Sequence, residues 1–321
     1  MNQRIMLITE DARAHLAAAL TRYYRGMERD DDDRAPEGPG LYWPTERGPS
    51  LAAKDDRLFF RSSLAPRAAV VPVFGLIWKG APAWLRQFGV TDPLLAAEGV
   101  EQAAADEDVD QIVLLVDSGG GFADGVPEAA ERIYGARGPK PIIAQVDGHA
   151  ASAAYYLASQ AADVRVPRLD EVGSIGVRAL FFDTSELFAE MGIKPILVDT
   201  GEHKSTGAPG VEVTEGQIAE VRRVVETVFE DFKAGVRRGR GLGVHALDEV
   251  ADGRMFFGYE AVERGLADRV MTVRDTFAGL AAAGAQVGRT ARKRAALTLA
   301  SRSNGLRPFG RRDAGDPRGG R

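Results

Sequence analysis

The residue best suited to covalent chemistry in this sequence is Ser152, in the small-residue segment DGHAASAA at 147–154. The segment follows the apolar run PIIAQV and precedes a helical pattern, which predicts a turn between a strand and a helix. Small neighbours let a substrate approach the backbone, and a helix N-terminus favours developing negative charge. Ser152 is therefore a candidate nucleophile, and its alternative role is that of a helix N-cap.

A serine nucleophile needs a base that accepts its proton. His149 precedes Ser152 by three residues, and a residue so close in a tight turn rarely reaches the hydroxyl with good geometry. Lys204 lies in the loop GEHKSTGAP at 201–209, after a predicted strand. Burial can turn a lysine into a base, because an ammonium group is costly to desolvate. Lys204 is thus the second candidate, and an ordinary surface lysine is the alternative interpretation.

The glycine-rich segment VDSGGG at 116–121 also follows an apolar run, QIVLLV. Consecutive glycines let backbone N–H groups approach a ligand, and such groups bind a phosphate or stabilise an oxyanion. The segment matches neither GxGxxG nor GxxxxGK[ST], the patterns typical of nucleotide binding. A tight turn without a ligand is the alternative interpretation.

The composition narrows the chemistry further. Among 321 residues there is no cysteine and there are four histidines: His15, His149, His203 and His245. The lack of cysteine excludes a disulfide framework, a thiolate metal site and a cysteine nucleophile, and the few histidines argue against a histidine metal site. We therefore predict no metal and no cofactor, and covalent catalysis would use Ser, Thr, Lys or a carboxylate.

The elements that must position these segments alternate between strand and helix. Strands are predicted at 69–78, 111–117, 141–147, 163–167 and 194–200, and helices at 93–106, 124–136, 151–161 and 215–238. The strands are apolar on both faces, which indicates an α/β domain with a largely parallel sheet. The helix at 215–238 carries an apolar stripe that suits a core, an oligomer contact or a domain contact: Ile218, Val221, Val225, Val228 and Phe232.

Taken together, these segments resemble the family of Ser-Lys serine peptidases that contains signal peptide peptidase A and the lambda-type phage head-maturation proteases. The resemblance runs from about Val70 to Val270. Its blocks are VDSGGG at 116–121, the segment 147–166, VGSIGV at 172–177, the loop 201–209 and ADGRMFFGYEAVERGLADRV at 251–270. One departure is Gly119, which stands where the family commonly has proline.

This resemblance implies a ClpP/crotonase-type fold of repeated β-β-α units. It makes Ser152 the nucleophile and Lys204 the general base, and it implies an oxyanion hole formed by the N–H groups of Gly120 or Gly121 and of Ala153. It also implies a ring-like homo-oligomer in which neighbouring protomers complete each other's active sites. Ser174, in the third block, is either a hydroxyl near the dyad or a turn residue.

Pattern and composition, together with the extent of the resemblance, divide the chain into a helical lead at 1–28, a flexible acidic and Pro/Gly-rich linker at 29–67, a peptidase domain at 68–283 and a basic disordered tail at 284–321. The linker holds the run Asp30–Asp33, which reads as solvated linker rather than as a metal site. From residue 289 onward the tail holds ten Lys or Arg and two Asp, although the whole chain carries a formal net charge of −5. Such a tail could tether the chain to an acidic partner or be dispensable.

No run of apolar residues reaches the ~20 residues that a membrane-spanning helix needs, and acidic residues come too early for a signal peptide. We therefore expect a cytoplasmic protein, with no membrane partner and with nucleic acid contacts only through the tail. The lack of a spanning helix favours the phage or prophage branch, whose proteases cut scaffold and capsid proteins inside an assembling head. The alternatives are a soluble signal-peptide-peptidase-like enzyme that degrades peptides, an acyl-CoA-binding crotonase-like enzyme, and an inactive shell protein.

Overall fold

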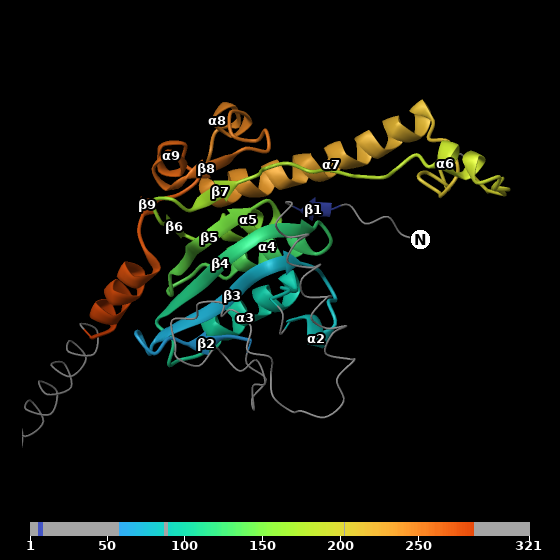
Figure 1. The fold of residues 1–321 in the computed structure, drawn as a ribbon. Helices are drawn as coiled ribbons and strands as arrows, with labels where there is room; N and C mark the ends of the chain where they lie inside the picture. Colours follow the sequence, from blue (N-terminus) through green and yellow to red (C-terminus); the bar gives the residue numbers. More distant parts are fainter. Residues whose placement is uncertain (1–5, 9–57, 87–88, 202, 286–321) are drawn as a thin grey trace, which may run out of the picture.

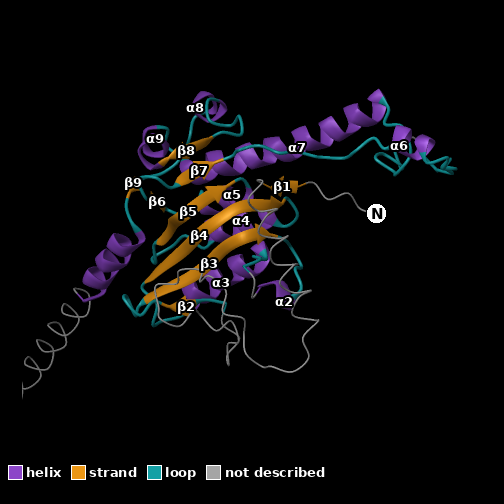
Figure 2. Ribbon diagram, in the orientation of Figure 1, coloured by secondary structure: helices purple, strands orange, loops and turns teal. Residues whose placement is uncertain are grey.

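A nine-stranded sheet forms the centre of the computed structural model, which describes residues 6–8, 58–86, 89–201 and 203–285 (Figure 1). Its strands are β1 (Met6–Ile8), β2 (Phe60–Arg61), β3 (Ala68–Ile77), β4 (Gln111–Phe122), β5 (Ile142–Ala151), β6 (Asp163–Val166), β7 (Glu171–Gly173), β8 (Met255–Phe257) and β9 (Arg269–Val270). Its helices are α2 (Ala83–Arg86), α3 (Pro93–Ala105), α4 (Val126–Gly135), α5 (Ala153–Ala158), α6 (Ser185–Glu190), α7 (Glu215–Arg240), α8 (Val244–Asp248) and α9 (Gly258–Glu263), and residues 273–285 are also helical. The predicted α/β class is confirmed (Figure 2).

The strands β3, β4, β5 and β6 run parallel to one another in that order. Along β4, Ile112 and Leu114 belong to the main core cluster with residues of α3, α4 and α5. The intervening Val113 and Leu115 belong to a second cluster with Phe277 of the helix at 273–285. Because successive side chains of a strand point to opposite faces, both faces of β4 are covered, which explains its unbroken apolar sequence.

The two segments predicted as turns are bends within long strands. β4 continues through the glycines to Phe122, and β5 continues to Ala151, with a register shift between Val116 and Ser118. Gly148 has φ +114°, and a Cβ there would lie 2.6 Å from Asp117 Oδ1, so the bend needs glycine. Our prediction that the strands end at 117 and 147 is therefore wrong. Each bent strand is followed by a helix, which is the β-β-α unit predicted for a ClpP/crotonase-type fold.

The predicted strand at 194–200 is the clearest other discrepancy. The structure forms no strand there, and all ten residues at 191–200 are exposed, with Ile196 at 88% and Val198 at 90%. They belong to a segment between β7 and α7, residues 178–214, that we call the arm; its α6 projects beyond the sheet (Figure 1). The sequence has strand character, but the described part of the chain offers it no neighbouring strand to pair with.

The helix α7 connects the arm to the body. Thr214 and Gln217 form a capping box at its start, Gly241 ends it with φ +66°, and its 26 residues span about 39 Å. Near its C-terminal end Phe232 is buried and stacks on Tyr156 with ring centroids 4.9 Å apart. The other stripe positions, Ile218, Val221, Val225 and Val228, are only half-buried. The C-terminal part of the stripe therefore packs in the core, and the remaining stripe residues stay partly exposed.

The division of the chain into four parts stays a prediction. Within the segments predicted as lead and linker, β1 pairs with β4 and β2 pairs with β3. The helical pattern at 9–25, the acidic run and the tail from 286 lie outside the described residues. Of the helices that the structure describes, none is both long and apolar enough to cross a membrane.

Gly235 lies where α7 meets α5, and a Cβ there would overlap the Tyr156 ring. We expect Gly235→Ala to lower the free energy of unfolding by roughly 2 kcal/mol, since the stacked ring cannot yield without moving Phe232. Gly279→Ala is the matched control, because a Cβ added to that exposed helical glycine would meet nothing within 4 Å, and this variant should gain about 0.5–1 kcal/mol. Urea denaturation of both variants measures the difference, and equal effects would contradict this account of the contact.

Candidate active site

Ser152 lies at the junction of β5 and α5 in a backbone conformation that L-residues rarely adopt, with φ +54° and ψ −122°. Its N–H donates to the Gly173 carbonyl oxygen at 2.9 Å, and its own carbonyl accepts from the Tyr156 N–H at 2.9 Å. The residue is 3% exposed, and its side chain makes no helix-capping hydrogen bond. The alternative role of its hydroxyl as an N-cap is therefore wrong, and the hydroxyl is not committed to the helix.

The position of Ser152 depends on α5, whose six residues are all buried. The Tyr155 hydroxyl donates to the Leu266 carbonyl at 2.9 Å, and burial raises the pKa of that hydroxyl, so it stays protonated as a donor. Two residues after α5 ends, Gln160 Nε2 donates to the Gly235 carbonyl of α7 at 3.1 Å. One hydrogen bond within α5 and one just after it therefore hold the helix, and Ser152 at its start is held with it.

The glycine stretch of β4 lies beside Ser152. Ser118 pairs with Ala150 in parallel register, and α5, which begins directly after Ser152, packs against β4. The buried Ser118 hydroxyl donates to the Gly75 carbonyl at 2.6 Å and accepts from the Gly120 N–H at 3.1 Å. The side chain of Ser118 thus fixes the stretch and uses the Gly120 amide.

The other two residues predicted for an oxyanion hole are Gly121 in β4 and Ala153 in α5. Gly121 follows directly in β4, and a Cβ there would overlap the Ile77 backbone, so only glycine fits. Ala153 is the first residue of α5, where an amide has no acceptor within its own helix. Ala153 directly follows Ser152, and α5 packs against β4, the strand that holds Gly120 and Gly121. The role of these three residues toward an oxyanion stays a prediction.

Lys204 is not brought to Ser152 within one chain. It is exposed, in a turn of the arm where its N–H donates to the Gly201 carbonyl at 3.1 Å. The arm's α6 lies beyond the N-terminal end of α7, whereas α5 packs near the C-terminal end of α7 (Figure 1). The loop that holds Lys204 leads to Gly210, whose N–H donates to Thr184 Oγ1 at the start of α6 at 2.8 Å. The segments of the two predicted dyad residues therefore lie toward opposite ends of α7.

The side chain of His149 lies near two carboxylates. Its Nδ1 lies 3.7 Å from Asp117 Oδ1 and its Nε2 lies 3.7 Å from Glu171 Oε2, and the side chain is about half exposed. Its backbone N–H donates to Asp117 Oδ1 at 3.2 Å. These contacts of the imidazole are thus with carboxylates, and the expectation that His149 rarely reaches the Ser152 hydroxyl with good geometry stays a prediction.

Sequence reasoning missed a group of carboxylates at the bends of β4 and β5. Burial raises the pKa of the Asp147 carboxyl, and the negative charges of Asp170 and Asp117 raise it further. Burial also raises the pKa of Asp170, although its carboxylate accepts from the Gly148 N–H at 2.6 Å. Among the described residues, no group of three His, Asp or Glu side chains could hold a metal ion. An aspartate at the end of each predicted strand, Asp117 and Asp147, was the available signal.

The two roles predicted for Ser174, a hydroxyl near the dyad or a turn residue, both stay predictions. Its φ is +49°, and its N–H donates to the Arg254 carbonyl at 2.7 Å. Among the described residues other than glycine, only Ser152 and Ser174 have positive φ. They are connected through Gly173, which accepts from Ser152 and directly precedes Ser174. The third block of the resemblance therefore supports the backbone of the serine.

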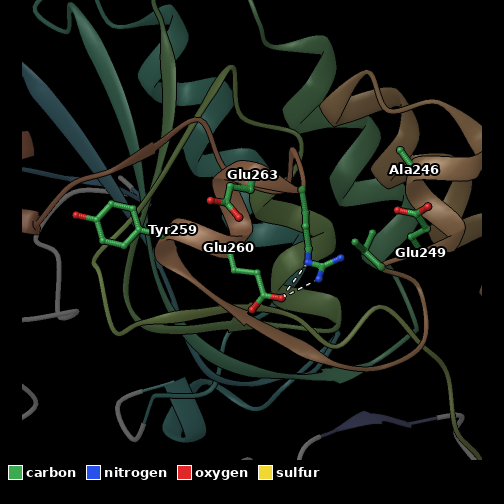
Figure 3. A pocket seen from close by; sticks show the side chains of 7 residues that line it. Ala246, Glu249, Tyr259, Glu260 and Glu263 are labelled. Atoms are coloured by element: carbon green, nitrogen blue, oxygen red, sulfur yellow. Dashed lines mark hydrogen bonds and ion pairs between the residues drawn. The ribbon is translucent and has the colours of Figure 1, made fainter.

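A cavity of about 710 Å³ lies between α8 and α9, away from the predicted site residues (Figure 3). It is lined by Ala246, Glu249, Val250, Tyr259, Glu260, Glu263 and Arg264. Arg264 Nη2 forms an ion pair with Glu260 Oε1 at 2.9 Å. None of the residues predicted for catalysis lines this cavity.

Comparison with known proteins identifies one peptidase family and several relatives. The family Peptidase family S49 matches residues 136–288, which include Ser152 and Lys204. The head-tail preconnector protein GP5 of Enterobacteria phage P21 is 30% identical over 217 residues, 67% of this chain and 43% of that protein. Capsid assembly protease C of Escherichia phage lambda is 28% identical over 207 residues, 64% of this chain and 47% of that protein.

The chain spans about half the length of the curated relatives that it matches. Among solved structures, that of an enoyl-CoA hydratase/isomerase family member aligns with 72% of this chain and 75% of its own, with 17% identity and a TM-score of 0.38. The match to family S49 confirms the predicted resemblance at the level of the peptidase family. The phage branch and the dyad remain predictions.

The strain at Ser152 can be measured through stability. We expect Ser152→Gly to unfold with a free energy about 1 kcal/mol higher than Ser152→Ala, because relief of a strained φ/ψ outweighs the greater freedom of glycine in the unfolded chain. Both variants lack the hydroxyl, so its loss cancels in the comparison. Thermal or chemical denaturation measures the difference, and equal stability of the two variants would show that the backbone of Ser152 is unstrained.

The raised pKa of Asp147 makes a prediction about pH. A carboxyl with a raised pKa favours the fold below its ordinary pKa of about 3.9, and this contribution is lost as the pH rises through the raised value. We therefore expect Asp147→Asn to raise the melting temperature at pH 7 and to raise it less at pH 4. Asp199→Asn, an exposed aspartate of the arm, should show no such dependence. A gain for Asp147→Asn that does not change with pH would refute the electrostatic explanation.

Proposed function

We propose that this chain is a serine endopeptidase of peptidase family S49, with Ser152 as nucleophile and Lys204 as general base. The observation that carries the proposal is the backbone of Ser152: a buried, strained serine at a strand–helix junction, with a hydroxyl that caps no helix. Strain of this kind is retained where surrounding structure over-determines it, and it clusters at active sites. The family match over residues 136–288 supports the same assignment.

The proposed reaction is acyl transfer. The amine of Lys204 accepts the proton of the Ser152 hydroxyl, and the oxygen attacks a peptide carbonyl carbon. The resulting oxyanion is stabilised by backbone N–H groups of the glycine stretch and of Ala153. When the C–N bond breaks, the lysine returns its proton to the leaving amine, and water then hydrolyses the acyl-enzyme by the same proton path.

The dyad is proposed to form between neighbouring protomers. Within one chain Lys204 is on the projecting arm, and the arm exposes apolar residues that a monomer would be expected to cover, among them Phe182, Ile196 and Val198. The half-buried stripe of α7 leads from this arm toward the body. Burial of these surfaces in a homo-oligomer would carry the lysine of one protomer to the serine of the next and would desolvate it there.

The proposed substrates are scaffold and capsid proteins during phage or prophage head maturation. The name of the lambda relative, a capsid assembly protease, supports this class, as does the likeness to the head-tail preconnector protein. The basic segment from 289 onward is proposed to hold the enzyme on an acidic partner. A peptide-degrading enzyme of the signal peptide peptidase A type is the alternative, and mass spectrometry of natural cleavage products would distinguish the two.

The shared site can be tested by mixing inactive variants. We expect Ser152→Ala and Lys204→Ala each to lose cleavage of a co-expressed scaffold protein by at least about a hundredfold. When the two are co-assembled in equal amounts, a ring with each site built from two protomers regains activity in about a quarter of its sites. Cleavage products are quantified by mass spectrometry.

The control replaces one partner with the double variant Ser152→Ala/Lys204→Ala. Mixed with Lys204→Ala, it supplies no lysine and should restore nothing. Full activity of Lys204→Ala alone would overturn the base assignment. Two inactive single variants that never complement each other would overturn the shared site and leave the serine assignment standing.

A further inference from the structure

The short strand β1 lies on the glycine stretch of β4. Met6 pairs with Phe122, Leu7 with Gly121 and Ile8 with Gly120, in antiparallel register. In the sequence, β1 is separated from the next described residue, Leu58, by 49 residues. A segment from the start of the chain is therefore placed on the same residues that are predicted to bind an oxyanion.

The edge that β1 occupies follows from the strand pairings. Each strand has two hydrogen-bonding edges, and β3 uses one edge of β4 as far as the pair Ile77–Gly121. The strand β5 uses the other edge, with Ser118–Ala150 as its last pair, and then leaves the sheet through Ser152 into α5. Because β3 already takes the first edge at Gly120 and Gly121, β1 must lie on the edge that β5 vacates.

This edge faces the candidate nucleophile. The strand β5 leaves this edge after the pair Ser118–Ala150, and Ser152 follows Ala150 by two residues, so the serine lies where the edge becomes free for β1. Because β1 is antiparallel to β4, it runs from Phe122 toward Gly120, and so toward Ser152. An extended polypeptide on this edge would present its backbone both to the serine and to the amides of the glycine stretch. In Figure 1, β1 lies at the end of β4 on the side of α5.

We propose that the edge of β4 at Gly120–Phe122 binds the peptide substrate as an added antiparallel strand, and that β1 occupies this edge in the resting chain as an internal competitor. The proposal rests on the proposed function for the role of Ser152 as nucleophile. Its ligand class is an extended polypeptide, recognised through main-chain hydrogen bonds. A strand of three residues is a weak element, so a substrate can replace it.

The occupancy of the edge is tested without catalysis, in the Ser152→Ala background. Hydrogen exchange of the amides at 119–122 is compared for the parent chain, Leu7→Pro and a chain lacking residues 2–8. Proline removes a backbone N–H and does not fit a paired strand, so both changes should speed exchange by roughly tenfold. Gln3→Pro puts the same residue outside β1 and should change nothing. A synthetic peptide of residues 1–9, added to the truncated chain, should restore protection.

The competition is tested on the chain with its serine intact. A fluorophosphonate probe should label Ser152 several-fold faster in Leu7→Pro and in the truncated chain than in the parent or Gln3→Pro, and the peptide should slow it again. Unchanged exchange at 119–122 overturns the placement of β1. Faster exchange with unchanged labelling of Ser152 overturns the competition. Failure of every chain to label Ser152, with exchange as predicted, overturns the proposed function instead and leaves β1 as the occupant of that edge.

Discussion

The hydrogen bond from the Ser152 N–H to the Gly173 carbonyl helps to hold the backbone of Ser152 at positive φ, and the candidate site depends on it. A residue at φ +54° costs about 1–3 kcal/mol, so it persists only when its neighbours are fixed. Gly173 is fixed in turn, because it pairs with Ala151 and with Met255 and has no room for a side chain. The block at 172–177 and the segment 251–257 therefore help to hold the backbone of Ser152.

The bends in β4 and β5 explain how one sheet creates this corner. Before the bends, the parallel strands fill both faces with apolar side chains and position α5. After them, the strands diverge, because β5 leaves for α5 while β4 continues through its glycines. The divergence leaves a strand edge without its parallel neighbour beside a serine. The carboxylates of Asp117 and Asp147 lie together at these bends, and burial and the nearby negative charges raise the pKa of Asp147. The geometry of the bends therefore carries an unfavourable electrostatic contribution.

The sequence predicted the periodic elements well and the bends and the arm poorly. Strands such as β3 could be predicted because a strand that is buried on both faces has an unbroken run of apolar residues, which is visible in the local sequence. The continuation of β4 past residue 117 depends on pairing with β1 and β3, which no local pattern encodes. The same limit explains the error at 194–200, where strand character exists without a partner. Ser152 and the glycines could be predicted as candidates from residue type and spacing, while the position of Lys204 depends on the direction in which α7 carries the arm.

Two surfaces of the single chain are not covered by its core. These are the apolar side chains of the arm and the edge of β4 that β5 leaves, and both need contacts from elsewhere. The arm is uncovered in the described chain, with Ile196 and Val198 almost fully exposed. The edge at Gly120–Phe122 is covered by the chain's own β1. If assembly buries the arm and a substrate replaces β1, the proposed base Lys204 and the peptide reach Ser152 by two independent events. Proteolysis would then require both.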